Sequence, residues 1–202
     1  MQETKDHFEH KSKTWDLNSK RVKNAGAIAD AIIANIALKS DMTIADFGAG
    51  TGLLSYFVAP YVDTIVAIDN SPSMLEMFKL KCNEFECKTQ LLHHDLDNDT
   101  LPHVYDGIIS SMTIHHIANQ QKLFEKMYAM VAQGGFIAIA DLDKEDGTFH
   151  DDNTGVFHFG FEREVLEEIV KNAGFKAIHF ETVSIIKKPH REFSVFLLTA
   201  YK

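Results

Sequence analysis

Hydrophobic positions along the chain alternate between helical repeats and short continuous runs. Apolar residues recur every three or four positions between Arg21 and Leu38, which predicts an amphipathic helix. From Thr43 onward, short runs rich in β-branched residues alternate with further helical repeats. The expected strands are 43–47, 64–68, 89–92, 105–110, 136–140, 176–183 and 193–201, and the expected helices are 53–61, 71–85, 120–131 (ended by Gly134-Gly135) and 162–172.

This alternation predicts the α/β class, with a Rossmann-like, seven-stranded, mostly parallel sheet and helices on both faces. The last two strands are joined without a helix, so they can be neighbours only if one C-terminal strand runs antiparallel. Residues 1–20 are polar, with isolated aromatic residues, and are expected to form an N-terminal arm or lid. Residues 21–202 are expected to form a single domain, because the chain shows no repeat or linker that would divide it.

A glycine-rich turn follows the first expected strand. The run Asp46-Phe47-Gly48-Ala49-Gly50-Thr51-Gly52-Leu53 predicts a strand end, a turn and the start of a helix. Because glycine lacks a Cβ atom, such a turn can take positive φ angles and a ligand can lie against bare backbone. A carboxylate just before the turn adds a charged acceptor. We therefore expect a nucleotide-like ligand, with a turn that binds nothing as the alternative.

The spacing of the glycines narrows the ligand. A dinucleotide fingerprint, G-x-G-x-x-G, fits Gly48 and Gly50 but has Leu53 in its third place, which disfavours an NAD-dependent oxidoreductase. A P-loop is excluded because no Gly-Lys-Ser/Thr follows. The string D-F-G-A-G-T-G closely resembles motif I of the class I S-adenosylmethionine (SAM)-dependent methyltransferases. The order of elements over residues 40–202 is similar to that family too.

The resemblance implies a set of cofactor-binding residues at the carboxyl ends of the first four strands. Asp46 would accept from the ammonium group of SAM, and Asp69 would accept from the ribose hydroxyls. Asp95 would accept from the adenine amino group. Because Asp97 and Asp99 are nearby carboxylates, the residue in this role could also lie two positions further along the chain. The full implied set is Asp46, Gly48, Ala49, Gly50, Asp69, Asn70, Met74, Asp95, Leu96, Ser110 and Ser111, and the product would be S-adenosylhomocysteine (SAH).

A catalytic base is harder to assign. His115 and His116 follow the fourth strand, and histidine can take up a proton at neutral pH. Either one could instead cap or pack the next helix. Because they are adjacent, we expect that they do not both point at one site, and nothing in the sequence favours one over the other.

The acceptor side is expected to include the loop after the fifth strand and the N-terminal arm. The acid-rich segment 141–152 fails as a calcium loop, so we expect a solvated loop that walls the acceptor pocket, without a metal; a site using His150 and the acids is the less favoured alternative. His150 and His158 form a second candidate base or orienting pair. Trp15 lies in an arm that resembles that of the quinone-biosynthesis members, and would either close over the sulfonium or anchor the arm.

Composition excludes several other functions. The net charge of −9 argues against a nucleic-acid partner. Cys82 and Cys87 match no zinc spacing, so free thiols in a reducing compartment are expected. No apolar run is long enough for a membrane span, and the N-terminal sequence lacks a signal-peptide core. These features predict a cytoplasmic protein, a monomer or homodimer.

The predicted function is therefore a SAM-dependent methyltransferase that transfers a methyl group to a small-molecule acceptor. A non-catalytic SAM-binding scaffold with the same fold is the alternative, because the cofactor-binding residues would be the same in both.

Overall fold

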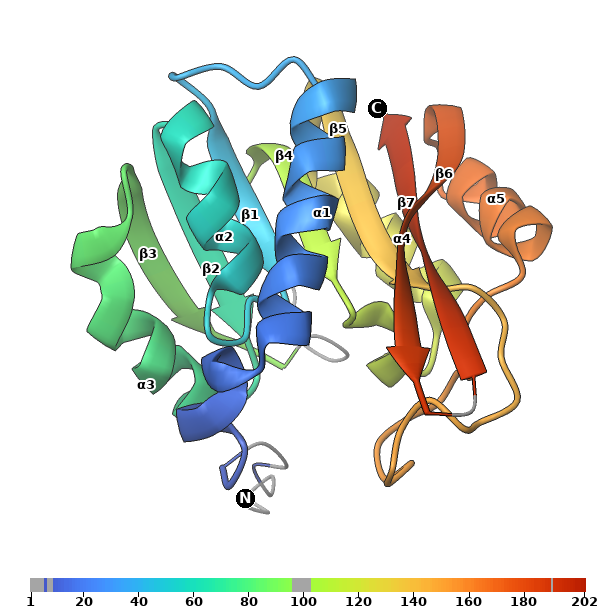
Figure 1. Cartoon of the computed structure of the whole chain (residues 1–202). Helices are drawn as coiled ribbons and strands as arrows, with labels where there is room; N and C mark the ends of the chain where they lie inside the picture. Colours follow the sequence, from blue (N-terminus) through green and yellow to red (C-terminus); the bar gives the residue numbers. More distant parts are fainter. Residues whose placement is uncertain (1–5, 7–8, 96–102, 190) are drawn as a thin grey trace, which may run out of the picture.

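The computed structural model describes residues 6, 9–95, 103–189 and 191–202. In these residues seven strands form one sheet in the order β3-β2-β1-β4-β5-β7-β6 (Figure 1). The strands are β1 Thr43–Phe47, β2 Thr64–Asp69, β3 Lys88–His93, β4 Tyr105–Ser111, β5 Val131–Leu142, β6 Lys176–Lys188 and β7 Arg191–Tyr201. Neighbours among β1 to β5 are parallel, whereas β7 is antiparallel to both β5 and β6. The predicted sheet and its reversed C-terminal strand are confirmed.

Helices cover both faces of this sheet (Figure 1). The α-helices are α1 Ser19–Asn35, α2 Leu53–Val58, α3 Pro72–Lys81, α4 Gln120–Met130 and α5 Arg163–Asn172. Short 3-10 turns are η1 Ser12–Leu17, η2 Ala59–Tyr61, η3 Cys82–Glu84 and η4 Ile114–His116. Helices α1, α2 and α3 contribute to one hydrophobic core, and α4 and α5 to the other.

The central strands are buried on both sides, which explains their continuous apolar runs. In β5, Ile137 and Ile139 face the core with α4 and α5, and Ala138 and Ala140 face the core with α1 and α2. Successive side chains of a strand point to opposite faces, so a strand between two helical layers needs apolar residues at every position.

Several boundaries differ from the sequence-based expectation. The glycines expected to end α4 lie inside β5, because α4 ends at Met130 and pairing shifts from Tyr105–Val131 to Gly107–Phe136. A Cβ atom on Gly135 would lie 2.5 Å from the Asp106 carbonyl oxygen, so close packing explains that glycine. The last turns of the helices expected at 53–61 and 71–85 are the 3-10 turns η2 and η3. Strand β6 runs on to Lys188 because it pairs with β7 up to Arg191.

The strand order reverses at the carboxyl ends of β1 and β4. Strand β1 lies between β2 and β4, so the connection after β1 leads to one side of the sheet and the connection that returns to β4 leads to the other. Open α/β sheets bind ligands at such a switch point. Both cysteine thiols are free. In the described part of the chain, none of the helices combines the length and the apolar character needed to cross a membrane.

Candidate active site

The glycine turn after β1 is held against β2. The N–H groups of Gly48 and Ala49 donate to the Ile68 carbonyl at 2.8 and 3.1 Å. Gly48, Gly50 and Gly52 have φ angles of +74°, +55° and +85°, which favour glycine. A Cβ atom would lie 2.2 Å from Thr113 at Gly48 and 2.6 Å from Phe78 at Gly52, but would meet no atom within 4 Å at Gly50. Packing therefore requires the outer two glycines, and open space lies over the middle one.

Asp69, at the end of β2, is bonded to this turn. Its carboxylate accepts from the Gly50 N–H at 2.7 Å and from the Ser71 N–H at 2.8 Å. Burial raises the pKa of Asp69, and the two hydrogen bonds oppose that rise. Ser71 in turn caps α3, because its hydroxyl accepts from the Met74 N–H at 3.2 Å. One carboxylate thus fixes the turn and the start of the next helix.

Asp46 is the second buried acid of the turn. It is 1% exposed and accepts from the Ser55 hydroxyl at 2.6 Å. Burial raises the pKa of Asp46 to about 7; the Ser55 hydrogen bond opposes the rise and the charge of Asp69 adds to it. Two carboxylates that influence each other therefore flank the glycine turn, as the sequence predicted.

The remaining residues proposed for the adenosine side lie near the ends of β2 and β3. Met74 is buried in the first turn of α3. Asn70 is exposed, and its carbonyl accepts from His93 Nε2 at 3.2 Å. Asp95 is half-buried just after β3, where the His94 N–H donates to the Asp69 carbonyl at 3.0 Å. Leu96 and the alternatives Asp97 and Asp99 lie outside the described residues.

The end of β4 contains one residue that supports the fold and several that face the turn. The Ser110 hydroxyl is fully buried and donates to the Phe47 carbonyl at 2.6 Å, which joins β4 to β1. Ser111 is half-buried, and its carbonyl accepts from the Thr113 hydroxyl at 3.1 Å. Thr113 also donates to the Gly48 carbonyl at 3.3 Å. Met112 has a φ angle of +56°, a strained value for a residue with a side chain, of the kind that clusters at functional sites.

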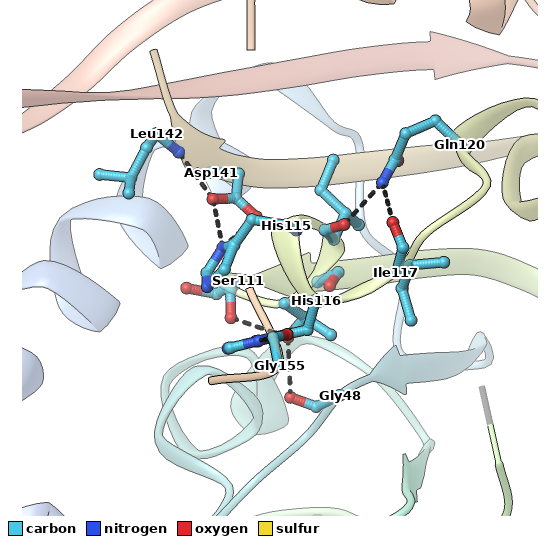
Figure 2. Close-up of polar contacts among 12 residues, drawn as sticks. Gly48, Ser111, His115, His116, Ile117, Gln120, Asp141, Leu142 and Gly155 are labelled. Carbon is cyan, nitrogen blue, oxygen red and sulfur yellow. Dashed lines mark hydrogen bonds and ion pairs between the residues drawn. The ribbon is translucent and has the colours of Figure 1, made fainter. Parts of the chain in front are cut away.

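His115 forms a buried pair with Asp141, at the end of β5 (Figure 2). Its Nδ1 atom lies 2.8 and 3.0 Å from the two carboxylate oxygens, and its backbone N–H donates to the same carboxylate at 3.2 Å. The side chains are 1% and 0% exposed. Burial alone would raise the pKa of Asp141, but the charge of His115 and the hydrogen bonds together lower it below its ordinary value.

Three histidine rings gather around this pair. The ring centroid of His115 lies 4.2 Å from that of His116 and 4.9 Å from that of His150, and the last two are 5.9 Å apart. Burial first, and then the charges of His115 and His116, together lower the pKa of His150 to about 4. His115 and His116 lie in the tight turn η4, where their rings are in contact, but their Nδ1 atoms bind different partners, Asp141 and the Gly155 carbonyl.

His158 is placed differently from His150. Its Nε2 atom donates to the Ile117 carbonyl at 3.0 Å, and its ring packs at 5.3 Å from that of Phe161. The backbone N–H groups of Phe157 and His158 donate to the His115 carbonyl at 3.0 and 3.2 Å. His158 therefore helps to hold the loop after β5 against η4.

The acid-rich loop is more ordered by hydrogen bonds than expected. Asp141 and Glu145 are buried, and Glu145 accepts from the N–H groups of Gly147 and Thr148, both at 2.8 Å. Asp143 accepts two hydrogen bonds from Arg163, each 2.7 Å long. The prediction of a solvated loop was wrong for these acids, because each has protein donors. Within the described ranges no group of three or more His, Cys, Asp or Glu residues is arranged to hold a metal ion.

The N-terminal arm is bonded to the glycine turn and to α3. Asp16 accepts from the Thr51 hydroxyl at 2.6 Å and pairs with Lys81. Asp6 accepts from the Ser71 hydroxyl at 2.8 Å. The Arg21 guanidinium lies 3.7 Å from the ring centroid of Trp15, so one face of the indole already has a cationic neighbour. These contacts place the arm beside the turn.

Sequence reasoning missed four residues of the site: Ser55, Thr113, Asp16 and Asp141. Asp141 had a signal, since it is an acid at the carboxyl end of a buried strand, like Asp46 and Asp69. The contacts of Ser55, Thr113 and Asp16 depend on side chains that meet only in the folded chain.

A mostly parallel sheet with a reversed β7, and a glycine turn between two buried acids at its switch point, define a Rossmann-like nucleotide-binding protein. Residues 44–135 match the family model of a methyltransferase domain. An uncharacterized methyltransferase of Schizosaccharomyces pombe is 32% identical over 158 residues, which are 70% of this chain and 56% of that protein. Phosphoethanolamine N-methyltransferase 1 of Zea mays is 29% identical over 153 residues, 72% of this chain and 30% of that protein.

Solved structures share the fold at low sequence identity. Phosphoethanolamine N-methyltransferase 2 of Haemonchus contortus, in complex with SAM, matches with a TM-score of 0.70 and 17% identity over 95% of this chain and 59% of that one. A Haloferax volcanii putative methyltransferase, solved with the Trm112 activator, matches with a TM-score of 0.75 and 15% identity over 98% of each chain. The chain is therefore similar to methyltransferases in sequence, and it has the fold of the class I SAM-dependent methyltransferases. It spans about half the length of the S. pombe relative and less of the Zea mays one.

Proposed function

We propose that this protein binds SAM at the glycine turn and transfers its methyl group to a small-molecule acceptor. The observation that carries the proposal is the turn itself, where Asp46 and Asp69 flank a left-handed Gly50 with open space beside it. Backbone without side chains suits the close approach of a nucleoside, and a carboxylate at the end of the second strand suits a ribose with free hydroxyls.

The residues present fit SAM. Asp69 would accept from the ribose hydroxyls, and Asp46 would accept from the ammonium group. An ammonium beside Asp46 favours the charged carboxylate and would counter the effect of burial. Asn70 and Met74 would border the ribose and adenine, with Asp95 at the adenine amino group. Asp16 would hold the arm over the turn, which supports a lid role for residues 1–20.

SAM, when bound, supplies a methyl group on a positively charged sulfur. The protein then has to align the acceptor with that methyl group and exclude water. The loop after β5 and η4 would form the acceptor side.

The acceptor is proposed from composition and from the relatives. The net charge of −9 disfavours a phosphate backbone as partner. Two of the relatives above are phosphoethanolamine N-methyltransferases, so phosphoethanolamine is the first acceptor to test. A cytoplasmic location and a monomeric or homodimeric state stay predictions from the sequence.

The test consists of a binding measurement and a turnover measurement. Calorimetry should show that the wild-type protein binds SAH, that Asp69→Asn binds it at least tenfold more weakly, and that Asp63→Asn, a change at the opposite end of β2, binds it normally. Incubation with SAM and a panel of small acceptors should then release SAH. Absence of SAH binding would overturn the proposal, whereas binding without turnover on any acceptor would favour the non-catalytic scaffold.

A further inference from the structure

Two imidazole nitrogens lie buried at the acceptor side without a hydrogen-bond partner. They are Nε2 of His115 and Nε2 of His150, on rings whose centroids are 4.9 Å apart. A buried polar atom that lacks a partner costs about 1–3 kcal/mol, so an unpartnered atom of this kind needs an explanation. Two of them on neighbouring rings indicate a place where a polar group of a ligand is missing.

The contact with Asp141 defines the chemistry of the His115 nitrogen. Because Nδ1 lies 2.8 Å from a carboxylate oxygen, the neutral ring carries its proton on Nδ1 and a lone pair on Nε2. The pKa of Asp141 lies below its ordinary value, so the carboxylate is charged and would stabilise an imidazolium after proton uptake. This is the arrangement by which an acid orients a histidine base in other enzymes.

The pair lies next to the proposed methyl-donor site. Turn η4 directly follows β4, and Thr113 at its start donates to the Gly48 carbonyl. Figure 2 shows His115 with Asp141 on one side, and on the other side Ser111 at the end of β4 and Gly48 in the glycine turn. Met112, with its strained φ angle, lies between Ser111 and Thr113, and its N–H donates a hydrogen bond to the Ala140 carbonyl at 2.8 Å.

We propose that His115 is the catalytic base of the methyl transfer, and that the acceptor presents a protonated oxygen, nitrogen or sulfur to His115 Nε2 and His150 Nε2. The inference rests on the proposed function and names the class of acceptor for that same site. His115 takes the proton of the acceptor at Nε2, and the freed electron pair of the acceptor forms the bond to the methyl carbon. The electrons of the broken carbon–sulfur bond stay on sulfur, which becomes the neutral thioether of SAH.

His150 has a supporting role at the same place. Its pKa of about 4 keeps the ring neutral near pH 7, so it can hydrogen-bond the acceptor without adding a charge. The charged or titratable groups that act on it are His115, His116, Asp141 and Lys188. Its loop also covers His115, because Gly155 accepts from His116 Nδ1 at 2.7 Å and Phe157 donates to the His115 carbonyl. An acceptor would therefore enter when this loop opens.

The alternative is a histidine–aspartate pair that only stabilises the fold. Substitution would then lower stability but leave the pH dependence of the rate unchanged. Both explanations keep the Nδ1–H tautomer, because Asp141 fixes it in either case. The pH dependence of the rate therefore distinguishes them, and the tautomer tests the premise that Nε2 carries a lone pair.

The experiment uses the full chain and three probe pairs. Phosphoethanolamine, catechol and thiophenol carry a removable proton, whereas phosphocholine, 1,2-dimethoxybenzene and thioanisole are their fully methylated counterparts. SAH release is measured at saturating SAM across pH for wild type, His115→Asn, Asp141→Asn and His150→Asn, with the exposed His179→Asn on β6 as matched control. SAH affinity by calorimetry is measured for each protein.

We expect transfer to a protic probe only. His115→Asn should slow it by about 10²- to 10⁴-fold, as is typical of general-base catalysis, with the ascending limb of the pH–rate profile lost and part of the rate restored by added imidazole. His179→Asn should match wild type. Nitrogen-15 NMR of labelled histidines in wild type with SAH should show His115 as the Nδ1–H tautomer, a readout that needs no variant to fold.

Several results would overturn the inference: an Nε2–H tautomer, an unchanged pH profile in His115→Asn, or a wild type that binds SAH but transfers to none of the protic probes. Failure of wild type to bind SAH would instead overturn the proposed function.

Discussion

The Gly50 N–H donates to the Asp69 carboxylate at 2.7 Å, so the acid proposed to bind ribose also holds the turn proposed to bind the rest of SAM. Removing the carboxylate therefore affects folding as well as binding. Asp69→Ala leaves the N–H groups of Gly50 and Ser71 without their acceptor, and Asp69→Asn leaves one of them facing an amide NH₂ group.

We expect Asp69→Ala to lower the free energy of unfolding by about 1–3 kcal/mol, and Asp69→Asn by less, because a buried donor that loses its partner costs that much. SAH affinity should fall at least tenfold in both. Denaturant unfolding and calorimetry measure the two effects. An Asp69→Ala variant with wild-type stability would show that these hydrogen bonds do not hold the turn.

The raised pKa of Asp46 predicts an effect of pH on stability. Its pKa is about 7 in the folded protein and 3.8 ordinarily, so the folded state binds the proton more tightly. This contribution to stability is fully present below pH 3.8 and is lost as pH rises through about 7. The difference in unfolding free energy between wild type and Asp46→Asn should change over that interval, and a constant difference would contradict a raised pKa.

The raised pKa of Asp46 predicts that ligand affinity depends on pH in the opposite direction to stability. SAM or SAH should bind the charged Asp46 through the ammonium group, so affinity should rise as pH increases from 6 to 8, by up to about tenfold per pH unit below the pKa. Calorimetry at several pH values measures this trend. In Asp46→Asn the part of this trend that is due to Asp46 should disappear, leaving the contribution of Asp69, whose pKa is also raised.

Alanine substitutions at three glycines distinguish the loss of ligand contact from the cost of backbone strain. Gly50 and Gly134 both have positive φ angles and open space where a Cβ atom would lie, but only Gly50 belongs to the turn. Gly50→Ala and Gly134→Ala should each lower the free energy of unfolding by about 1–2 kcal/mol, the ordinary cost of a left-handed alanine. Only Gly50→Ala should also lose SAH affinity by calorimetry. Gly52→Ala should be less stable than either, because its Cβ atom would lie 2.6 Å from Phe78.

Asp16 offers a test of the arm. Asp16→Asn removes the charge that pairs with Lys81 while keeping an oxygen for the Thr51 hydroxyl. The half-exposed ion pair should contribute less than about 1 kcal/mol to stability. If the arm is a lid, SAH should dissociate several-fold faster in stopped-flow measurements. Unchanged dissociation would leave the arm as a structural anchor, and Asp30→Asn on α1 serves as the control.

Much of the fold could be predicted because it depends on local patterns. Strand β1 was predicted at its observed bounds, since β-branched and apolar residues run directly into the glycine turn. The positions of Asp46 and Asp69 followed from the rule that acids after parallel strands meet at one edge. The extent of β6 was underestimated, because only Ile185 and Ile186 are apolar beyond Val183, and this end is extended by its pairing with β7.

The site was predicted less completely than the fold. Asp141 pairs with His115 only because β4 and β5 lie in a particular register, and the chain folds back through a long loop before His150 joins them. The glycines near the start of β5 were taken as a helix end, since a close approach to the Asp106 carbonyl cannot be seen in a sequence. Side-chain partners far apart in the chain are set by packing, which a single sequence does not display.

The position of β7 bears on how the chain folds during synthesis. Strand β7 follows β6 in the sequence but lies between β5 and β6 in the sheet. Until β7 has left the ribosome, β5 has an open edge of hydrogen-bonding groups and β6 has no neighbour. Open edges of this kind invite pairing with other chains. Newly made chains should therefore be most prone to aggregate just before β7 emerges, and a chaperone that shields β5 at that stage would raise the yield of folded protein.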